Sequence, residues 1–244
     1  MSGFFPESAM ILAAGRGERL RPLTDDRPKP LMTLGEGTLL DHALDKLCQA
    51  GVPRIVVNAH YKAQMLIQHL EERPGNKAQI LISHEAERPL DTGGGVKNAL
   101  PLLRGESFFV LSGDMPLTEG SSPSLARLAK AFDPEKMDAL LLVLPTRSPR
   151  AHGFDPQGGD FFMQADGRLT RKDTALPRPY VYISAMIVQR ACYEPFAPGV
   201  FSNNLIFDEA EAKGRLYGLE HDGACFHIST PQDYAFACLH WAES

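Results

Sequence analysis

The sequence predicts an α/β fold, a three-layer α/β/α sandwich built on a mixed, mainly parallel central sheet. Short apolar runs that end in glycine or polar residues alternate with stretches of helical periodicity, the pattern of strands joined by helical crossovers. The chain has 244 residues, of which 43% are hydrophobic, so it is long enough to bury one substantial core. We therefore expect a single domain that spans residues 1–244.

The first part of the chain predicts five strands with helices between them. One helix is expected to begin after Thr38 as its N-cap and to end before Gly51, because the apolar residues between them fall on one face. The tract 84–95 is expected to be a loop that leads into a helix N-terminus, since helical spacing follows its three glycines. The strands are expected at 9–14, 54–58, 79–83, 107–111 and 139–144, and further helices at 62–72, 96–103 and 125–132.

From about Thr146 the pattern changes to an irregular stretch rich in glycine and proline. Asp166 and Gly167 are expected to turn a hairpin, and residues 180–188 predict a sixth strand. We expect this second half, about 146–244, to fold over the first half, about 1–145, and to shape the site of a second substrate.

Composition excludes several classes of protein. The net charge of −5 and the pI near 5.9 argue against nucleic-acid binding, which needs clustered Lys and Arg. No segment reaches the roughly 18 apolar residues of a membrane span, and the N-terminus lacks the pattern of a signal peptide. The four cysteines are too widely spaced for a zinc site or a redox pair, so we expect them to be buried apolar side chains. We expect a cytoplasmic protein that binds neither nucleic acid nor membrane.

The stretch LAAGRGERLRPLT followed by RPKPL combines several requirements of triphosphate binding. Its small residues let a nucleotide lie against the backbone, and its glycines permit a tight turn with converging N–H groups. The guanidinium of Arg19 can grip phosphate oxygens, and the prolines on both sides of Lys29 restrict its loop. The residues expected to contact the nucleotide here are Leu12, Ala13, Ala14, Gly15 and Gly17.

Other interpretations of this stretch fit less well. A lone GxG would favour a solvated surface turn, but the whole string makes phosphate binding the better interpretation. A dinucleotide-binding motif would need its third glycine at Leu20, and a P-loop would need a GK[ST] that does not follow.

The motif LAAGxGxRLxPLT with PKPL resembles the sugar-nucleotide pyrophosphorylases, the sugar-1-phosphate nucleotidylyltransferase family, and the resemblance continues nearly to the end of the chain. It implies a Rossmann-like, GT-A-like form of the sandwich, with a nucleotide-binding first half and a sugar-binding second half. It also implies that Arg19 clamps the triphosphate and the leaving pyrophosphate, and that Lys29 contacts phosphate.

Asp114 follows an apolar strand in LSGD, at the carboxyl end where open α/β sheets bind ligands. The resemblance implies that Asp114 is a ligand of Mg²⁺, which often takes only one or two carboxylates and completes its shell with phosphate oxygens and water. The alternative is an Asp that caps the next element. We expect Mg²⁺ as the cofactor.

The segment LDTGGG resembles the family's loop that reads the nucleobase, where glycines let the base approach the backbone. The alternative is a flexible connection, although the helical pattern that follows favours an ordered loop. The identity of the base is not readable from the segment. The residues expected to bind nucleotide there are Asp91, Thr92, Gly93 and Gly94.

The chain departs from the family near its C-terminus. Many relatives carry a WxDxGT segment with a second metal carboxylate, whereas this chain has CFHIST, which puts His227 at the Asp position and Ser229 at the Gly position. Because His is a poor ligand of Mg²⁺, we expect the metal to be held by Asp114 and phosphates, with His227 touching phosphate or water. A structural His under the C-terminal helix is an equal alternative.

The resemblance implies that a sugar-1-phosphate oxygen attacks the α-phosphorus of a nucleoside triphosphate and displaces pyrophosphate, with Mg²⁺ at Asp114, together with Arg19 and Lys29, offsetting charge. The compact length and the LDTGGG segment are most similar to the N-acetylmuramate-1-phosphate uridylyltransferases of bacterial cell-wall recycling, which use UTP. The alternatives are a mannose-1-phosphate guanylyltransferase that uses GTP, and a noncatalytic nucleotide-sugar-binding protein. A monomer and a homodimer are both compatible. The sugar-side candidates are Asp160, Ser184 and Asn203.

Overall fold

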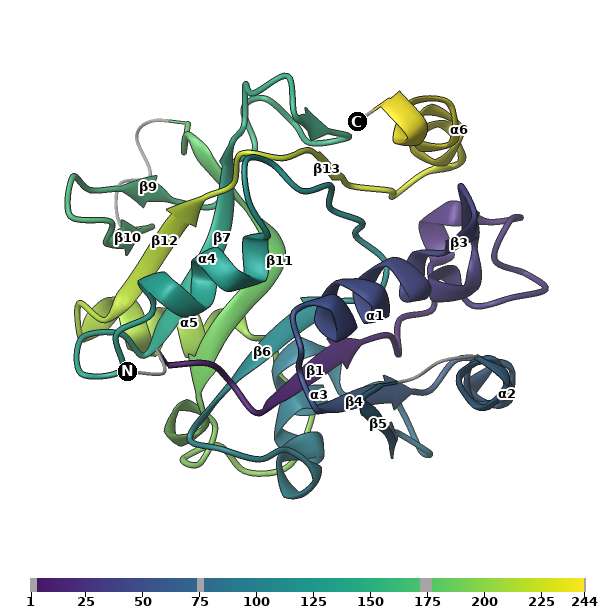
Figure 1. Cartoon of the computed structure of the whole chain (residues 1–244), viewed down its shortest axis with the longest axis horizontal. Helices are drawn as coiled ribbons and strands as arrows, with labels where there is room; N and C mark the ends of the chain where they lie inside the picture. Colours follow the sequence, from purple (N-terminus) through teal and green to yellow (C-terminus); the bar gives the residue numbers. More distant parts are fainter. Residues whose placement is uncertain (1–3, 74–76, 172–176, 244) are drawn as a thin grey trace.

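A computed structural model of the chain describes residues 4–73, 77–171 and 177–243. A seven-stranded sheet crosses the molecule in the order β12-β7-β11-β6-β1-β4-β5 (Figure 1). Strand β11 runs antiparallel to both of its neighbours, and every other neighbouring pair in this sheet is parallel. The mixed, mainly parallel sheet is therefore confirmed. The strands are β1 (Ser8–Leu12), β4 (Arg54–Ala59), β5 (Gln79–His84), β6 (Ser107–Ser112), β7 (Ala139–Pro145), β11 (Tyr180–Gln189) and β12 (Leu216–Glu220).

Helices cover both faces of this sheet. Successive side chains of a strand point to opposite faces, so Ile11 of β1 faces one helical layer and Met10 faces the other. Helices α1 (Leu39–Gln49), α2 (Ala63–Glu72) and α4 (Ser124–Ala131) pack into the cluster that contains Ile11. Helices α3 (Asp91–Ala99) and α5 (Asn204–Ala212) pack into the cluster that contains Met10. The three-layer α/β/α sandwich is confirmed.

The predicted signals at the ends of α1 are confirmed. The Thr38 hydroxyl accepts from the Asp41 N–H at 3.1 Å, and the Asp41 carboxylate accepts from the Thr38 N–H at 3.0 Å, which forms a capping box. Gly51 follows the last turn with a φ of +82°, a left-handed conformation that glycine adopts without a Cβ clash.

A third, smaller cluster joins the C-terminal helix α6 (Pro231–His240) to the segment that follows the first loop. Phe226 and Ala237 pack there against Leu34 and Leu39. The Tyr234 hydroxyl donates to the Thr33 carbonyl at 2.6 Å. The short elements are β2 (Thr33–Leu34), β3 (Gly37–Thr38), β8 (Ala151–His152), β9 (Phe162–Met163), β10 (Leu169–Thr170) and β13 (Cys225–Phe226). The 3₁₀ helices are η1 (Glu18–Leu20), η2 (Lys29–Leu31), η3 (Leu100–Leu102), η4 (Arg190–Cys192) and η5 (Trp241–Glu243).

The second half of the chain contributes strands to the same sheet. Strand β11 lies between β6 and β7, and β12, which the sequence did not predict, forms the edge beside β7. The predicted hairpin is confirmed, because β9 and β10 pair antiparallel and Gly167 between them has a φ of +87°. No described helix has the length and apolar character that crossing a membrane demands.

Three expectations need correction. The first strand ends at Leu12 and not at Ala14. The tract 84–95 is not a loop throughout, because α3 begins at Asp91 and contains all three glycines. A Cβ on Gly94 would lie 2.1 Å from the Gly199 carbonyl oxygen, so close packing of this helix against the segment 199–202 requires the glycine. Of the four cysteines, only Cys225 is buried as expected, because Cys48 and Cys192 are partly exposed and Cys238 is exposed on α6.

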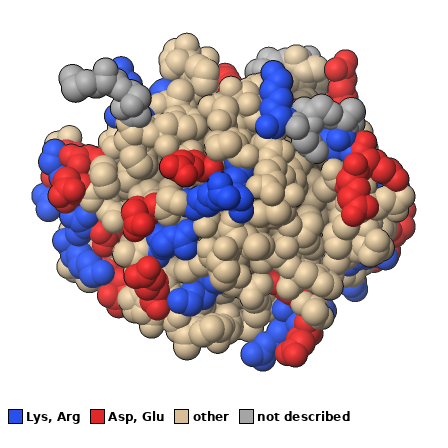
Figure 2. All heavy atoms as spheres, turned by 60° about the horizontal axis from the view of Figure 1, so that its bottom comes forward, with Lys and Arg blue, Asp and Glu red and all other residues tan. Residues whose placement is uncertain are grey.

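Charged side chains of both signs are interspersed on the face seen in Figure 2. Lys and Arg side chains lie next to Asp and Glu side chains there, and neither sign covers a continuous area of that face. The ion pairs at the surface include Arg168 with Asp166 at 2.7 Å. Exposed pairs of this kind contribute about 0–1 kcal/mol each, so the packed core carries the stability of the fold.

Candidate active site

The glycine loop that follows β1 turns sharply and packs on Lys29. Gly17 has a φ of +63°, and its carbonyl accepts from the Thr24 hydroxyl at 2.9 Å. A Cβ on Gly17 would lie 3.0 Å from the Cβ of Lys29 and 3.1 Å from the Cγ2 of Thr24. Gly15 differs, because its φ is not positive and a Cβ there would meet no heavy atom within 4 Å. The fold itself therefore requires glycine at position 17 but not at position 15.

Lys29 and Asp114 form an ion pair at the carboxyl end of the sheet. Lys29 lies in η2 between two prolines, and Asp114 comes two residues after the end of β6. The Lys29 Nζ lies 2.8 Å from the Asp114 Oδ2, and the Ser112 hydroxyl donates to the Asp114 Oδ1. Burial acts to raise the pKa of Asp114, but the Lys29 ammonium and the Ser112 hydrogen bond outweigh it and hold that pKa below its ordinary value. Asp114 is therefore a carboxylate at neutral pH.

Arg19 and Asp114 line one cavity of about 390 Å³. Lys29 and Ser229 line the same cavity, so the glycine loop, the end of β6 and the segment after β13 meet there. Arg19 is exposed and makes no ion pair or side-chain hydrogen bond with any other residue that the structure describes. Its guanidinium is therefore available to an anionic ligand.

A second cavity of about 200 Å³ shares Asp114 with the first. The glycine loop forms one wall, and Asp91 and Thr92 at the start of α3 form another. Asp91 has a φ of +61°, unusual for a residue other than glycine, and its side chain accepts from the Thr92 N–H at 2.6 Å. The residues that line this cavity are Leu12, Ala14, Gly15, Asn58, Glu85, Pro89, Asp91, Thr92, Ser112 and Asp114.

The predicted nucleotide-binding glycines of α3 occupy a different place from Asp91 and Thr92. Gly93 and Gly94 are buried, and a Cβ on Gly93 would lie 2.5 Å from the ring of Phe201. The Gly94 N–H donates to the Phe201 carbonyl at 2.9 Å. These two glycines therefore serve the contact between α3 and the segment 199–202, and neither lines the cavity that Asp91 and Thr92 share with Asp114. Ala13 also lies outside that lining, since it is buried and its N–H donates to the Asn58 side chain at 2.6 Å.

Sequence reasoning missed Asn58 and Glu85, which line the cavity from β4 and from the residue after β5. Both are buried polar side chains, with 2% and 3% of their surfaces exposed. The signal that identified Asp114 also applies to them, because both stand at the carboxyl ends of parallel strands.

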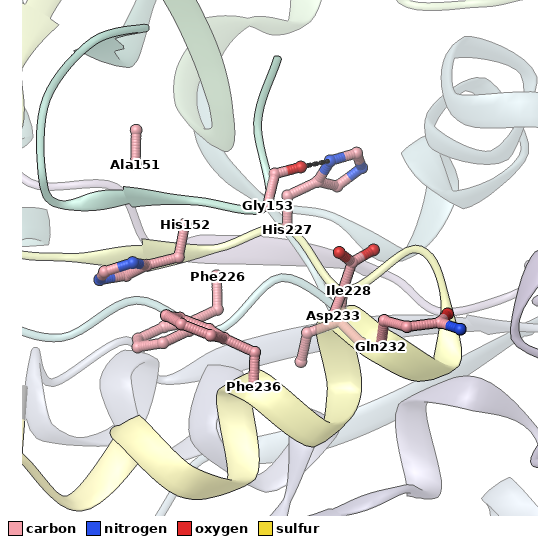
Figure 3. A pocket seen from close by; sticks show the side chains of 9 residues that line it. All are labelled: Ala151, His152, Gly153, Phe226, His227, Ile228, Gln232, Asp233 and Phe236. Atoms are coloured by element: carbon pink, nitrogen blue, oxygen red, sulfur yellow. Dashed lines mark hydrogen bonds between the residues drawn. The ribbon is translucent and has the colours of Figure 1, made fainter. Parts of the chain in front are cut away.

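His227 lies beside this site with both ring nitrogens occupied. The imidazole Nδ1 donates to the Gly153 carbonyl at 3.2 Å (Figure 3), and Nε2 accepts from the Ser229 hydroxyl at 2.8 Å. Burial lowers the pKa of His227, and the positive charges of Lys29 and Arg19 lower it further. The ring is therefore neutral at pH 7. It also stacks on Phe154, with ring centroids 5.0 Å apart.

An aromatic cavity of about 430 Å³ lies next to His227 (Figure 3). His152 stacks on Phe226 with ring centroids 4.5 Å apart, and Phe236 of α6 lies on the same side of the cavity. Ile228 lines this cavity and also the cavity that contains Arg19. The aromatic cavity is lined by the carboxylate of Asp233 and by no Lys or Arg that the structure describes, so the cavity that Arg19 and Lys29 line suits a phosphorylated ligand better.

The three predicted sugar-side residues lie outside the two cavities that Asp114 lines. Asp160 accepts from the Tyr182 N–H at 2.9 Å, and burial raises the pKa of its carboxyl. Ser184 has a φ of +55° where the register between β11 and β7 shifts. Asn203 is buried, and its side-chain oxygen accepts from the Tyr193 hydroxyl at 2.9 Å.

The donor set around Asp114 fits a hard cation that arrives with phosphate ligands. Asp114 supplies carboxylate oxygens, and Mg²⁺ often binds proteins through one or two such groups. In the described part of the chain, no three His, Cys, Asp or Glu side chains are grouped so that they could hold a metal by themselves. The Nε2 of His227 already accepts from Ser229, and a neutral imidazole is a poor ligand for Mg²⁺.

Comparisons with known proteins agree with this geometry. The profile of the family described as nucleotidyl transferase matches residues 8–158. The N-acetylmuramate alpha-1-phosphate uridylyltransferase of Caulobacter vibrioides is 38% identical and covers 98% of both chains. A mannose-1-phosphate guanylyltransferase of Mycobacterium tuberculosis is 32% identical over 93% of this chain but only 62% of its own length.

Among solved structures, HddC from Yersinia pseudotuberculosis complexed with GMP-PN superposes with a TM-score of 0.75. The match covers 96% of this chain and 99% of that one, and at 22% identity it supports the fold alone. The sequence profile and the uridylyltransferase relative cover most of this chain, including Arg19, Lys29 and Asp114. The chain belongs to the nucleotidyl transferase family.

Proposed function

We propose that this chain transfers a uridylyl group from UTP to N-acetylmuramate 1-phosphate, forming the nucleotide sugar and releasing pyrophosphate. The observation that carries the proposal is the shared position of Asp114. It lines one cavity with Arg19 and Lys29 and a second cavity with the glycine loop and the start of α3. A nucleotide whose nucleoside occupies the second cavity would extend its phosphates past Asp114 toward Arg19.

The relatives support the choice of substrates. The uridylyltransferase of Caulobacter vibrioides matches this chain over 98% of both lengths, whereas the guanylyltransferase extends well beyond it. The match therefore spans 98% of the uridylyltransferase and 62% of the guanylyltransferase.

In the proposed reaction, an oxygen of the sugar 1-phosphate attacks the α-phosphorus of UTP, and the bond from that phosphorus to the β-phosphate oxygen breaks. Pyrophosphate leaves with the bonding electrons. The attacking phosphate is already anionic at neutral pH, so the site needs no strong base. The work of the protein is to orient the two substrates and to offset their negative charge.

Three side chains divide this work. Arg19 is exposed and unpaired among the described residues, and its planar fork suits the oxygens of the departing pyrophosphate. Lys29 forms an ion pair with Asp114, and a phosphate that enters the cavity can replace the Asp114 carboxylate as the partner of Lys29. Asp114 would then hold Mg²⁺, which supplies a Lewis acid that neutralises phosphate charge when it is bound.

A cytoplasmic location and a monomeric or homodimeric state remain predictions.

A turnover panel tests the proposal. The purified protein is incubated with Mg²⁺ and with each pairing of UTP or GTP with N-acetylmuramate 1-phosphate or mannose 1-phosphate. Pyrophosphate release and the nucleotide sugar are both measured. We expect the highest kcat/KM for UTP with N-acetylmuramate 1-phosphate. A preference for GTP with mannose 1-phosphate would replace this proposal with the guanylyltransferase, and nucleotide binding without pyrophosphate release would favour a noncatalytic binding protein.

The roles of Arg19 and Asp114 have their own test. We expect Arg19→Ala and Asp114→Ala to remain folded and to lose about 100-fold or more in kcat/KM, because the first removes a cation that offsets phosphate charge and the second removes the carboxylate that would hold Mg²⁺. Arg16→Ala is the matched control, since Arg16 lines the same cavity but forms a surface ion pair with Glu18 at 3.7 Å. Near-normal pyrophosphate release in either variant would remove that residue from the mechanism.

A further inference from the structure

Asn58 and Glu85 form a buried polar link between the glycine loop and the start of α3. The Asn58 Oδ1 accepts from the Ala13 N–H at 2.6 Å, and the Asn58 Nδ2 donates to the Glu85 Oε1 at 2.6 Å. The Glu85 Oε2 accepts from the Leu90 N–H at 2.8 Å. Three hydrogen bonds in series therefore join Ala13 to Leu90, the residue before α3.

The surroundings of this link leave it little freedom. A Cβ on Gly95 would lie 2.8 Å from the Asn58 Nδ2 and 2.9 Å from the Glu85 Oε1, so only glycine lets α3 pack this closely. No Lys or Arg that the structure describes forms an ion pair with Glu85, whose carboxylate is held by neutral donors alone. Burying such a group without a cation is costly in free energy. Groups of this kind commonly persist where they determine a geometry that function needs.

We propose that the Asn58–Glu85 pair positions the nucleoside triphosphate by setting the separation between the glycine loop and the N-terminus of α3. This inference rests on the proposed function, because it assigns the nucleotide to the cavity between those two segments. Asn58 and Glu85 line that cavity, yet their described polar contacts are all with the protein. They are positioning residues and not catalytic ones.

The direction of the hydrogen bonds provides a sharp test. In Glu85→Gln, the new amide must point its N–H₂ group at one of two donors, the Asn58 amide or the Leu90 N–H. In Asn58→Asp, two carboxylates face each other in a buried site. In the double variant Asn58→Asp with Glu85→Gln, the amide of residue 85 donates to the carboxylate of residue 58, and all three hydrogen bonds return. The double variant also keeps the net charge and the number of side-chain heavy atoms of the pair.

The experiment compares the wild type, both single variants and the double variant. The dissociation constant of UTP is measured by calorimetry, and the KM values of UTP and of the sugar phosphate are measured by pyrophosphate release. We expect each single variant to weaken UTP binding about tenfold or more, the range for leaving a buried donor or acceptor unsatisfied. We expect the double variant to return to within about threefold of the wild type, with the KM of the sugar phosphate changing about twofold or less in all variants.

Ser8→Ala is the matched control. Ser8 is fully buried at the opposite end of β1, where its hydroxyl donates to the Arg104 carbonyl at 2.8 Å and accepts from the Arg104 N–H at 3.0 Å. The variant loses buried hydrogen bonds far along the strand from the glycine loop, so we expect lower stability and unchanged UTP binding. If Glu85→Gln does not fold, Glu85→Asp replaces it, because it keeps the carboxylate and shortens its reach by one methylene.

The outcomes separate the two claims. The positioning role would be overturned if the single variants bind UTP as tightly as the wild type and differ from it only in having a smaller fraction of folded protein. A double variant that stays as weak as the single variants would also overturn it. A wild type that binds UTP but releases no pyrophosphate would refute the proposed function alone, because the calorimetric comparison still tests the link. A wild type that does not bind UTP would refute both.

Discussion

Substitution by alanine should affect two glycines of the first loop differently, lowering the stability of the protein at Gly17 and raising the KM of UTP at Gly15. Gly17→Ala places a Cβ on a backbone with φ of +63°, which costs about 1–2 kcal/mol for an L residue. The same Cβ would lie 3.0 Å from Lys29 and 3.1 Å from Thr24, closer than the roughly 3.5–4.0 Å of a comfortable carbon contact. We expect a loss of about 2 kcal/mol, which lowers the Tm of a chain of this size by about 4–8 °C.

Gly15→Ala should leave stability nearly unchanged, because its φ is ordinary and a Cβ there meets no heavy atom within 4 Å. Surface substitutions of this kind stay within about 0.5 kcal/mol. The added methyl would project into the space that we assign to the nucleotide, so we expect the KM of UTP to rise about tenfold, the effect of modest overpacking. Thermal unfolding and pyrophosphate release measure the two effects. Equal losses of stability in both variants, or an unchanged KM in Gly15→Ala, would refute the reasoning.

Two further predictions concern stability and thiol chemistry. Asp41→Asn should destabilise the protein by about 2 kcal/mol at pH 7, because the Asp41 carboxylate closes the capping box with Thr38 and contacts two basic side chains. Hydrogen bonds and charge hold the pKa of Asp41 far below its ordinary value, so this stabilisation is complete above about pH 4 and is lost as the pH falls further. In urea unfolding, the difference in free energy of unfolding between the wild type and the variant should therefore be smaller at pH 3 than at pH 7. An equal difference at both pH values would contradict this prediction. Iodoacetamide at pH 8 should alkylate exposed Cys238 before Cys192 and Cys225, because burial raises the pKa of Cys192 to about 12 and the thiolate is the reactive form. Mass spectrometry of the modified peptides measures the order, and early labelling of Cys225 would show that its side chain is not buried as described.

Features with local causes could be predicted from the sequence. Thr38 and Gly51 bracket α1 through contacts within a few residues, and Gly167 turns a hairpin by its own backbone conformation. Asp114 could be placed at the carboxyl end of a strand because an apolar run stops just before it. These predictions succeeded because the physical reason for each lies inside a short window of the chain.

Features with distant causes could not be predicted. The glycines of α3 were predicted to lie in a loop, but Gly93 and Gly94 are required by contacts with Phe201 and Gly199, about one hundred residues later in the chain. Asn58 and Glu85 gain their significance from each other and from Ala13, 45 residues before Asn58. The hydrophobic periodicity of one segment does not show which distant segment packs against it.

The sequence by itself determined the alternation of strands and helices, the chemistry of the glycine loop and the identity of the charged residues Arg19, Lys29 and Asp114. Only the tertiary structure decided that these three residues meet at one cavity, that Asp114 also lines a second cavity, and that His227 is a neutral ring held by Gly153 and Ser229. The reason is that side-chain chemistry and local conformational preference are encoded residue by residue. Burial, ion pairing and hydrogen-bond direction instead depend on which distant segments the packed sheet brings together.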